Sequence, residues 1–176
     1  WMRFEESRGP ALRRNQAAAK ASAPFLLFLD DDSYPCSGTL ESALGAFADD
    51  RLGAFGFRVL LADQCESGGA FNAVVACGAC VRRSAFLEAG GFPADFGFYV
   101  EEYALCYRLL QLGWQVRIEE QPVVRHLKAG GQRDPAEILR RLVLNNRRLL
   151  EPQAPHLPSV DRKSTRLNSS HLVISY

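Results

Sequence analysis

The stretch Phe25-Leu26-Leu27-Phe28-Leu29-Asp30-Asp31-Asp32 decides the fold class. Its five apolar residues do not alternate with polar ones, which predicts a strand buried on both faces, as in a parallel sheet covered by helices. Successive side chains of a strand point to opposite faces, so Asp30 and Asp32 share a face while Asp31 turns aside. Open α/β sheets bind ligands beyond the carboxyl ends of their strands. The stretch therefore predicts an α/β fold with a carboxylate site at this end of the sheet.

The two carboxylates of Asp30 and Asp32 suggest a metal site. Oxygen ligands suit Mg²⁺ or Mn²⁺, particularly when the phosphates of a substrate and water fill the remaining positions. The alternative is an Asp-rich turn that ends a strand and is simply solvated. The apolar strand before the aspartates and the features of the second half of the chain favour a metal and diphosphate site.

The rest of the chain alternates helix and strand patterns, with Gly, Pro and Asp at their boundaries. The expected helices cover residues 10–22, 40–47, 84–89, 101–112 and 135–150, and the expected strands cover 25–29, 54–61, 71–81 and 114–118. A turn is expected at 34–38 and an aromatic loop at 92–100. Two buried faces are expected, Leu40, Leu44 and Phe47 on a helix and Phe55, Phe57 and Val59 on a strand. Gly78, inside a strand pattern, marks a bulge, the close approach of a ligand or a packing constraint.

Length and composition limit what the chain can be. Its 176 residues suffice for one domain with a real core, and they are 47% apolar and 23% charged with a formal net charge of +1. A nucleic-acid-binding surface needs a concentrated positive charge, which a net charge of +1 does not indicate, so no nucleic-acid partner is expected. No apolar run approaches the ~20 residues of a membrane span.

The five cysteines are scattered. Cys77 and Cys80 have the spacing of a redox or zinc pair, but no second pair completes a tetrahedral site. Free buried thiols are therefore expected, and with them a reducing, cytoplasmic location.

The two ends of the chain have unusual features. The sequence begins at Trp1, and the aspartate-bearing strand follows a single expected helix, so we expect residues 1–151 to be a partial domain that has lost earlier strands. Prolines mark residues 152–160 as a linker, and residues 161–176 are expected to be a non-native, disordered tail. The helix at 135–150 has a basic side that is either solvated or in contact with anionic lipid head groups, which would place the protein at the inner face of the membrane.

Several motifs occur in one order between residues 3 and 150. They are Arg14-Asn15 on a helix, Phe28-Leu29-Asp30-Asp31-Asp32, Arg82-Arg83-Ser84-Ala85-Phe86, Gly90-Gly91-Phe92, Phe98-Tyr99-Val100-Glu101-Glu102-Tyr103-Ala104-Leu105-Cys106-Tyr107-Arg108, Gly113 and Val124-Arg125-His126. This ordered set resembles the family 2 glycosyltransferases, which are inverting enzymes of the GT-A fold. The resemblance implies a GT-A-type domain, a mixed sheet flanked by helices, without the N-terminal strands that bind the nucleotide.

The resemblance also implies a donor and metal site. The first acid of the family's Asp-x-Asp motif lies near the ribose and diphosphate of the nucleotide-sugar donor, and the last acid binds Mg or Mn. The histidine after the last strand approaches the metal or diphosphate in many relatives, although alone it would more often be a surface residue. The implied donor-binding residues are Arg14, Asn15, Asp30 and Asp31, and the implied metal ligands are Asp32 and His126.

The glutamate pair matches the family's catalytic acids, of which the second is the base. We therefore expect Glu102 to accept the proton of the acceptor hydroxyl, next to Glu101, and the start of the helix to keep the carboxylate ionised. The alternative is that two glutamates simply start a helix well. Gly91 and Phe92 match the region beneath the sugars, although the aromatic residues around them could equally be core.

Two departures from the family pattern matter. Glu102 stands where Asp is usual, and Ala104 stands where relatives often carry Asp. The implied activity is metal-dependent transfer of a hexosyl or deoxyhexosyl group, with inversion, to a hydroxyl of a glycan or lipid-linked acceptor in cell-surface polysaccharide or glycolipid synthesis. The chain alone is expected to be inactive. The alternatives are an inactive relative that serves as a scaffold and a nucleotidyltransferase of similar fold.

Overall fold

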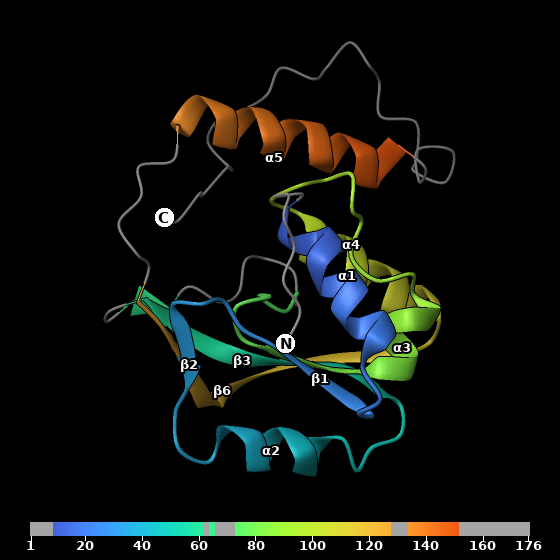
Figure 1. The fold of residues 1–176 in the computed structure, drawn as a ribbon, viewed down its shortest axis with the longest axis vertical. Helices are drawn as coiled ribbons and strands as arrows, with labels where there is room; N and C mark the ends of the chain where they lie inside the picture. The colour runs from blue at the N-terminus through green and yellow to red at the C-terminus, as the bar shows by residue number, and fades with distance from the viewer. Residues whose placement is uncertain (1–8, 62–63, 66–72, 128–133, 152–176) are drawn as a thin grey trace, which may run out of the picture.

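A mixed sheet with helices on both faces organises the chain. The computed structural model describes residues 9–61, 64–65, 73–127 and 134–151, in which six strands have the order β1-β5-β3-β6-β2, with β4 paired to β3. Helix α2 covers one face and α1, α3 and α4 cover the other, while α5 lies beyond them (Figure 1). The helices are α1 Pro10–Lys20, α2 Thr39–Ala46, α3 Arg83–Glu88, α4 Glu101–Gln111 and α5 Pro135–Leu150. The strands are β1 Phe25–Phe28, β2 Ser33–Pro35, β3 Leu52–Leu61, β4 Gln64–Cys65, β5 Ala79–Arg82 and β6 Gln115–His126. The expected mixed α/β sheet flanked by helices is confirmed.

The strand before the aspartates differs from the prediction. β1 pairs antiparallel with β5, and the parallel pair of the sheet is β3 with β6. Both faces of β1 contact apolar neighbours. However, β1 is the last strand at one edge of the described sheet, so Leu27 remains 37% exposed. The prediction of a parallel strand buried on both faces was therefore wrong in its pairing and partly wrong in its burial.

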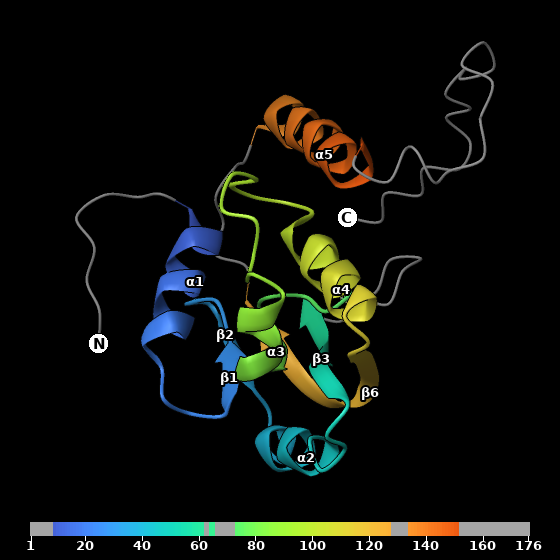
Figure 2. The same cartoon turned by 90° about the vertical axis from the view of Figure 1, so that its right-hand side faces the viewer.

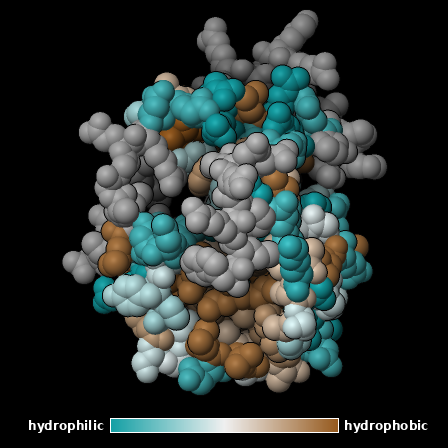
Figure 3. Space-filling model, in the orientation of Figure 1, coloured by the Kyte–Doolittle hydropathy of each residue, from teal (hydrophilic) through white to brown (hydrophobic). Residues whose placement is uncertain are grey.

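One face of β3 supports the core beneath the sheet. Phe55, Phe57 and Val59 are fully buried against α2, as the alternation predicted. The predicted buried face of the helix at 40–47 was right for Phe47 but wrong for Leu40 and Leu44, which are 45% and 56% exposed. The Thr39 hydroxyl donates a hydrogen bond to the Val123 carbonyl at 3.1 Å, which turns the stripe of Thr39, Ala43 and Phe47 inward instead. Figure 3 shows apolar surface low on one side of the molecule, where β1 and α2 lie.

Three local predictions need correction. Residues 71 and 72 of the expected strand at 71–81 lie outside the described residues, and in the described part only β5 is a strand, because residues 73–78 close a turn in which the Gly78 N–H donates to the Val75 carbonyl. A Cβ at Gly78 would lie 2.6 Å from Val59 Cγ2, so close packing explains the glycine at this position. The expected turn at 34–38 begins with β2, and β6 continues the expected strand at 114–118 without a break as far as His126.

The helix boundaries follow the sequence signals. Gly9, at φ 79°, and Pro10 start α1, and the Asp134 carboxylate accepts the Ala136 N–H at 3.0 Å to cap α5. The basic side of α5 is largely ion-paired, through the pairs Arg140–Glu137, Arg141–Glu137, Arg147–Glu151 and Arg148–Asp95. None of the helices in the described ranges is long and apolar enough to cross a membrane. The expected linker at 152–160 and tail at 161–176 lie outside the described residues.

Candidate active site

The candidate site begins where β1 ends and β2 starts. Asp30 and Asp32 stand on this connection, and His126 is the last residue of β6. Because Ser33 of β2 is in register with His126, the ladder brings the histidine beside Asp32, whose Oδ1 lies 3.1 Å from Nε2 of the ring. One ligand atom from each of Asp30, Asp32 and His126 falls within 4.8 Å of the other two. Asp31 is exposed and outside this group, as the strand alternation predicted.

Local hydrogen bonds fix the aspartate connection. The Asp30 N–H donates to Ser33 Oγ at 2.8 Å, and the Ser33 N–H donates back to the Asp30 carbonyl at 3.1 Å. The Leu127 N–H donates to the Asp32 carbonyl at 2.8 Å, which ties the connection to the end of β6. The three candidate ligands are therefore held by backbone pairing across two strands.

The donor set fits a divalent cation. Two carboxylates supply hard oxygen ligands, and an imidazole nitrogen suits a transition metal better than Mg²⁺. The His126 Nδ1 lies 3.8 Å from the buried Cys77 Sγ, while its Nε2 faces Asp32. Carboxylates with one histidine therefore favour Mn²⁺ over Mg²⁺ at Asp30, Asp32 and His126.

Helix α1 supplies the neighbouring positive charge. Arg14 Nη2 lies 2.5 Å from Asp30 Oδ1, and its side chain is only 14% exposed. Its guanidinium also lies 5.8 Å from the centroid of the Phe92 ring. Arg14 therefore stands over the candidate site with its charge directed at one of the carboxylates, which suits the predicted donor-binding role.

Asn15 holds the backbone that follows α3. Its Nδ2 donates to the Phe92 carbonyl at 2.7 Å, and its Oδ1 accepts the Phe92 N–H at 2.9 Å. Gly91 has φ 67°, and a Cβ there would lie 2.5 Å from Asn15 Oδ1, so only glycine fits the approach. The amide of Asn15 is thus engaged with the protein, and its predicted contact with the donor stays a prediction.

Phe92 belongs to the core. It is 2% exposed, and its ring centroid lies 5.3 Å from those of Phe28 and Phe86. A ring enclosed in this way has no face to offer a sugar, so the alternative that the aromatic residues are core holds at this position.

The two glutamates start α4, where Glu101 is buried and Glu102 is half-buried. Glu101 is 3% exposed, and its Oε2 has no hydrogen-bond partner among the described residues. The Ala76 N–H donates to Glu102 Oε1 at 3.3 Å. Burial raises the pKa of Glu101 to about 7, with a further contribution from the charge of Glu102. Burial also raises the pKa of Glu102, against the opposing effect of backbone N–H groups.

This result corrects the expectation that the helix start keeps the carboxylates ionised. Desolvation outweighs the favourable N–H groups, so both groups hold protons more tightly than usual. Arg14 lowers and Asp30 raises the pKa of both glutamates, which places the pair within electrostatic reach of the aspartate group.

The segment before the glutamates is strained, and the residue that holds it was not predicted from the sequence. Tyr99 and Val100 have φ values of 70° and 72°, in the left-handed region that side-chain-bearing residues rarely adopt. Asn145 of α5 is 2% exposed and donates to three carbonyl groups of this segment. A signal for it existed, because asparagine is a poor helix former and stands in mid-helix here.

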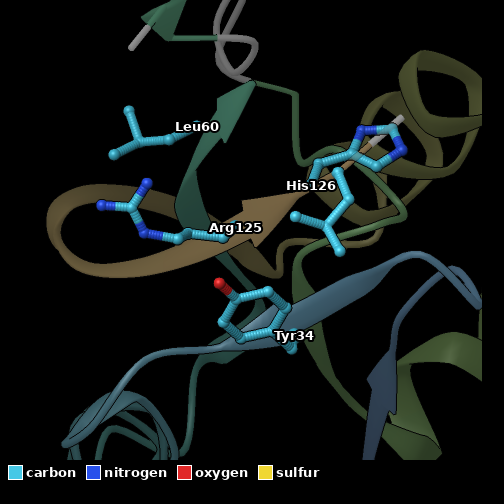
Figure 4. A pocket seen from close by; sticks show the side chains of 5 residues that line it. Tyr34, Leu60, Arg125 and His126 are labelled. Atoms are coloured by element: carbon cyan, nitrogen blue, oxygen red, sulfur yellow. The ribbon is translucent and has the colours of Figure 1, made fainter. Parts of the chain in front are cut away.

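A hollow of about 280 Å³ lies next to the aspartate group (Figure 4). It is lined by Tyr34, Leu60, Arg125, His126 and Leu127. Tyr34 and Leu60 are both in register with Arg125, so the three form one row across β2, β6 and β3. Tyr34, Arg125 and His126 give this space its polar groups, and of these only His126 was predicted as a site residue from the sequence.

Comparison with known proteins agrees with this geometry. Residues 2–69 match the model of "Glycosyl transferase family 2". The pre-mycofactocin glycosyltransferases of two Mycobacterium tuberculosis strains are 29% identical over an alignment of 143 residues, and the match covers 68% of this chain and 30% of theirs. The chain therefore spans less than a third of the length of these relatives.

Solved structures show the same fold. A mannosyltransferase from Pyrobaculum calidifontis, PcManGT, in complex with GDP-Man and Mn²⁺, matches with a TM-score of 0.63 at 19% identity, covering 89% of this chain and 46% of that one. S. aureus TarS 1–349 in complex with UDP-GlcNAc matches with a TM-score of 0.57 at 17% identity, covering 73% of this chain and 42% of that one. At these identities the likeness establishes the GT-A fold.

Proposed function

We propose that the protein transfers a sugar from a nucleotide-sugar donor to an acceptor hydroxyl, since residues 2–69 match the glycosyl transferase family 2 model and the chain has the GT-A fold. The observation that carries the proposal is the convergence of Asp30, Asp32 and His126 at one end of the sheet. The Glu101–Glu102 pair lies within electrostatic reach of this group. A donor diphosphate and an acceptor hydroxyl need these two kinds of group side by side.

Asp30, Asp32 and His126 would hold the cation, which we propose is Mn²⁺ or Mg²⁺. A divalent cation in such a site offsets the negative charge of a departing diphosphate. Arg14 supplies a fixed positive charge on the same side, which favours binding of the anionic donor. The rigid connection at Asp30 and Ser33 limits the movement of the carboxylates when the donor arrives.

Glu102 is the proposed base. The acceptor oxygen attacks the anomeric carbon opposite the departing group, a new glycosidic bond forms, and the bond to the diphosphate oxygen breaks in the same step with inversion. The hydroxyl proton passes to the Glu102 carboxylate. Burial raises the pKa of this carboxyl, which makes its ionised form a stronger proton acceptor than an exposed glutamate.

The ligands of similar structures support a proposal for the donor class. The similar structures hold GDP-Man and UDP-GlcNAc, which share a sugar diphosphate and differ in base and sugar. We therefore propose a hexosyl or deoxyhexosyl donor joined to a nucleoside diphosphate, and a glycan or lipid-linked acceptor. The proposed setting is the cytoplasm, at the inner face of the membrane when the acceptor is lipid-linked.

Removal of the metal tests the proposal. Release of sugar from a panel of UDP-, GDP- and dTDP-sugars is measured with the full-length protein, with Mn²⁺ and with a chelator. We expect turnover to require the cation and Asp32→Asn to lose most of it. Asp50→Asn is the matched control, because this aspartate is 99% exposed and lies outside the group, and it should retain turnover. Undiminished turnover in chelator would leave the aspartates as a solvated turn.

A further inference from the structure

Asn145 stands out among the buried polar residues. It is one of three polar residues buried in the part of the chain that the structure describes, with Thr39 and Glu101. Its Nδ2 lies 3.0 Å from the carbonyl oxygen of Phe96 and 2.9 Å from those of Phe98 and Tyr99. All three neighbours are acceptors, so the amide nitrogen must face them, and its two hydrogens are shared among three carbonyl groups.

The backbone that Asn145 holds is the strained one. Tyr99 and Val100 lie in succession at positive φ, and Val100 is β-branched, which makes this conformation unfavourable without outside support. The Val100 carbonyl then accepts the Ala104 N–H at 3.0 Å in the first turn of α4. The conformation at residues 99 and 100 therefore sets the point and direction from which α4, and with it Glu101 and Glu102, begins.

The rest of α5 makes contact with the same loop. Arg148, three residues after Asn145, donates to the Asp95 carbonyl at 2.9 Å and lies 3.8 Å from its carboxylate. Leu142 and Leu149 pack against the cluster of Phe96, Val100 and Ala104. Figure 2 shows the loop between α3 and α4 rising to meet α5, while the sheet lies far below the helix.

We propose that α5 is a clamp on this loop and that Asn145 is a positioning residue for the glutamate pair. The inference rests on the proposed function, in which the glutamates take part in the chemistry. Within the described part of the chain, the hydrogen bonds of Asn145 run to the backbone just before the pair, and none reaches Glu101 or Glu102. Its effect on the reaction is therefore transmitted through the start of α4.

Asn145→Asp is the decisive variant. It keeps the shape of the side chain and replaces the donating NH₂ with an oxygen that repels the three carbonyl groups. Asn145→Ala is a second variant, which removes the donor without adding a charge. Asn146→Asp is the matched control, because Asn146 is exposed on the same helix and donates only to the Leu142 carbonyl, at 2.8 Å, among the described residues.

Two measurements on the full-length protein test the clamp. The first is Mn²⁺-dependent turnover of the nucleotide-sugar that the unmutated protein uses best. We expect kcat to fall about 10²-fold in both Asn145 variants with little change in donor KM, because a misplacement of about 1 Å is enough for such a loss. The second is backbone amide exchange at residues 98–102, which should become faster in both variants and stay unchanged in Asn146→Asp.

The outcomes separate the clamp from the proposed function. If the unmutated protein turns over no nucleotide-sugar, the proposed function fails, while faster exchange at 98–102 still supports the clamp. If Asn145→Asp had the same kcat and the same amide exchange at residues 98–102 as the unmutated protein, the proposed clamp would be overturned. Equal losses in kcat, donor affinity and melting temperature would also overturn it, because they would make Asn145 a residue that only maintains the fold.

Discussion

Glu101 places a carboxyl group where ionisation is costly. It is 3% exposed, its Oε2 lacks a hydrogen-bond partner within the described part of the chain, and burial raises its pKa to about 7 from an ordinary value of 4.5. Between these two values the unfolded chain is ionised while the folded protein still holds the proton. Stability is therefore lost as the pH rises from about 4.5 to about 7, by up to ~3 kcal/mol.

This shift predicts a pH-dependent effect of Glu101→Gln. The variant removes the charge, so its melting temperature should exceed that of the unmutated protein by several degrees at pH 8, since ~1 kcal/mol corresponds to ~2–4 °C at this size. The gain should shrink at pH 5, where the folded protein holds the proton. Thermal melting at the two pH values measures it, with Glu41→Gln, at an exposed position of α2, as control. An equal gain at both pH values would mean that Glu101 carries no buried charge.

Part of the site could be predicted residue by residue. The alternation of a strand was enough to separate Asp30 and Asp32 from Asp31, and the family resemblance pointed to His126, which the structure brings into the same group. The raised pKa values of the glutamates could not be predicted, because their burial comes from segments remote in sequence, such as residues around Ala76.

At the scale of elements, the turn before β5 packs closely against the centre of the sheet. A Cβ on Gly78 would lie 2.6 Å from Val59 Cγ2 and 3.3 Å from Val124 Cβ, both on strands at the centre of the sheet. The turn can move little, because the Phe57 N–H donates to the Gly78 carbonyl at 3.1 Å. Overpacking is therefore expected when any side chain is added there.

Gly78→Ala should accordingly lower the free energy of unfolding by ~1–3 kcal/mol. Gly45→Ala is the matched control, because Gly45 lies on α2 with nothing within 4 Å of a new Cβ. Loss of a helical glycine should stabilise the protein by ~0.5–1 kcal/mol. Urea unfolding of both variants measures the difference. Equal stabilities would mean that the sheet accommodates the methyl group without strain.

Elements with strong boundary signals were predictable. Pro10 and Asp134 marked helix starts, and Gly113 followed the end of α4, whereas β2 and the true extent of β5 were missed. β2 is three residues long and exists through its pairing with β6, and such pairing leaves no local pattern. The inward face of α2 was misjudged for a related reason, since a hydrogen bond to Val123 orients the helix.

At the scale of the molecule, the site is assembled from parts that are distant in sequence. α1 supplies Arg14, the β1–β2 connection supplies the aspartates, β6 supplies the histidine and α4 supplies the glutamates. The family match covers residues 2–69, which hold the first two of these parts. The fold class could be predicted from β1 and its aspartates, while the role of α5 over the loop before α4 could be found only in the structure.

The claim that this site catalyses sugar transfer is tested most directly by the rate of transfer in Glu102→Gln. In the full-length protein with Mn²⁺, transfer from the nucleotide-sugar should fall ~10²–10⁴-fold, because the variant keeps the shape of the base and removes its proton-accepting charge. Donor affinity should stay within a few fold, and Glu101→Gln should lose less activity. If Glu101→Gln lost transfer while Glu102→Gln stayed active, the base would be Glu101 and not Glu102. Full transfer in both variants, or none in the unmutated protein across all donors and acceptors, would contradict a catalytic site here and favour a scaffold.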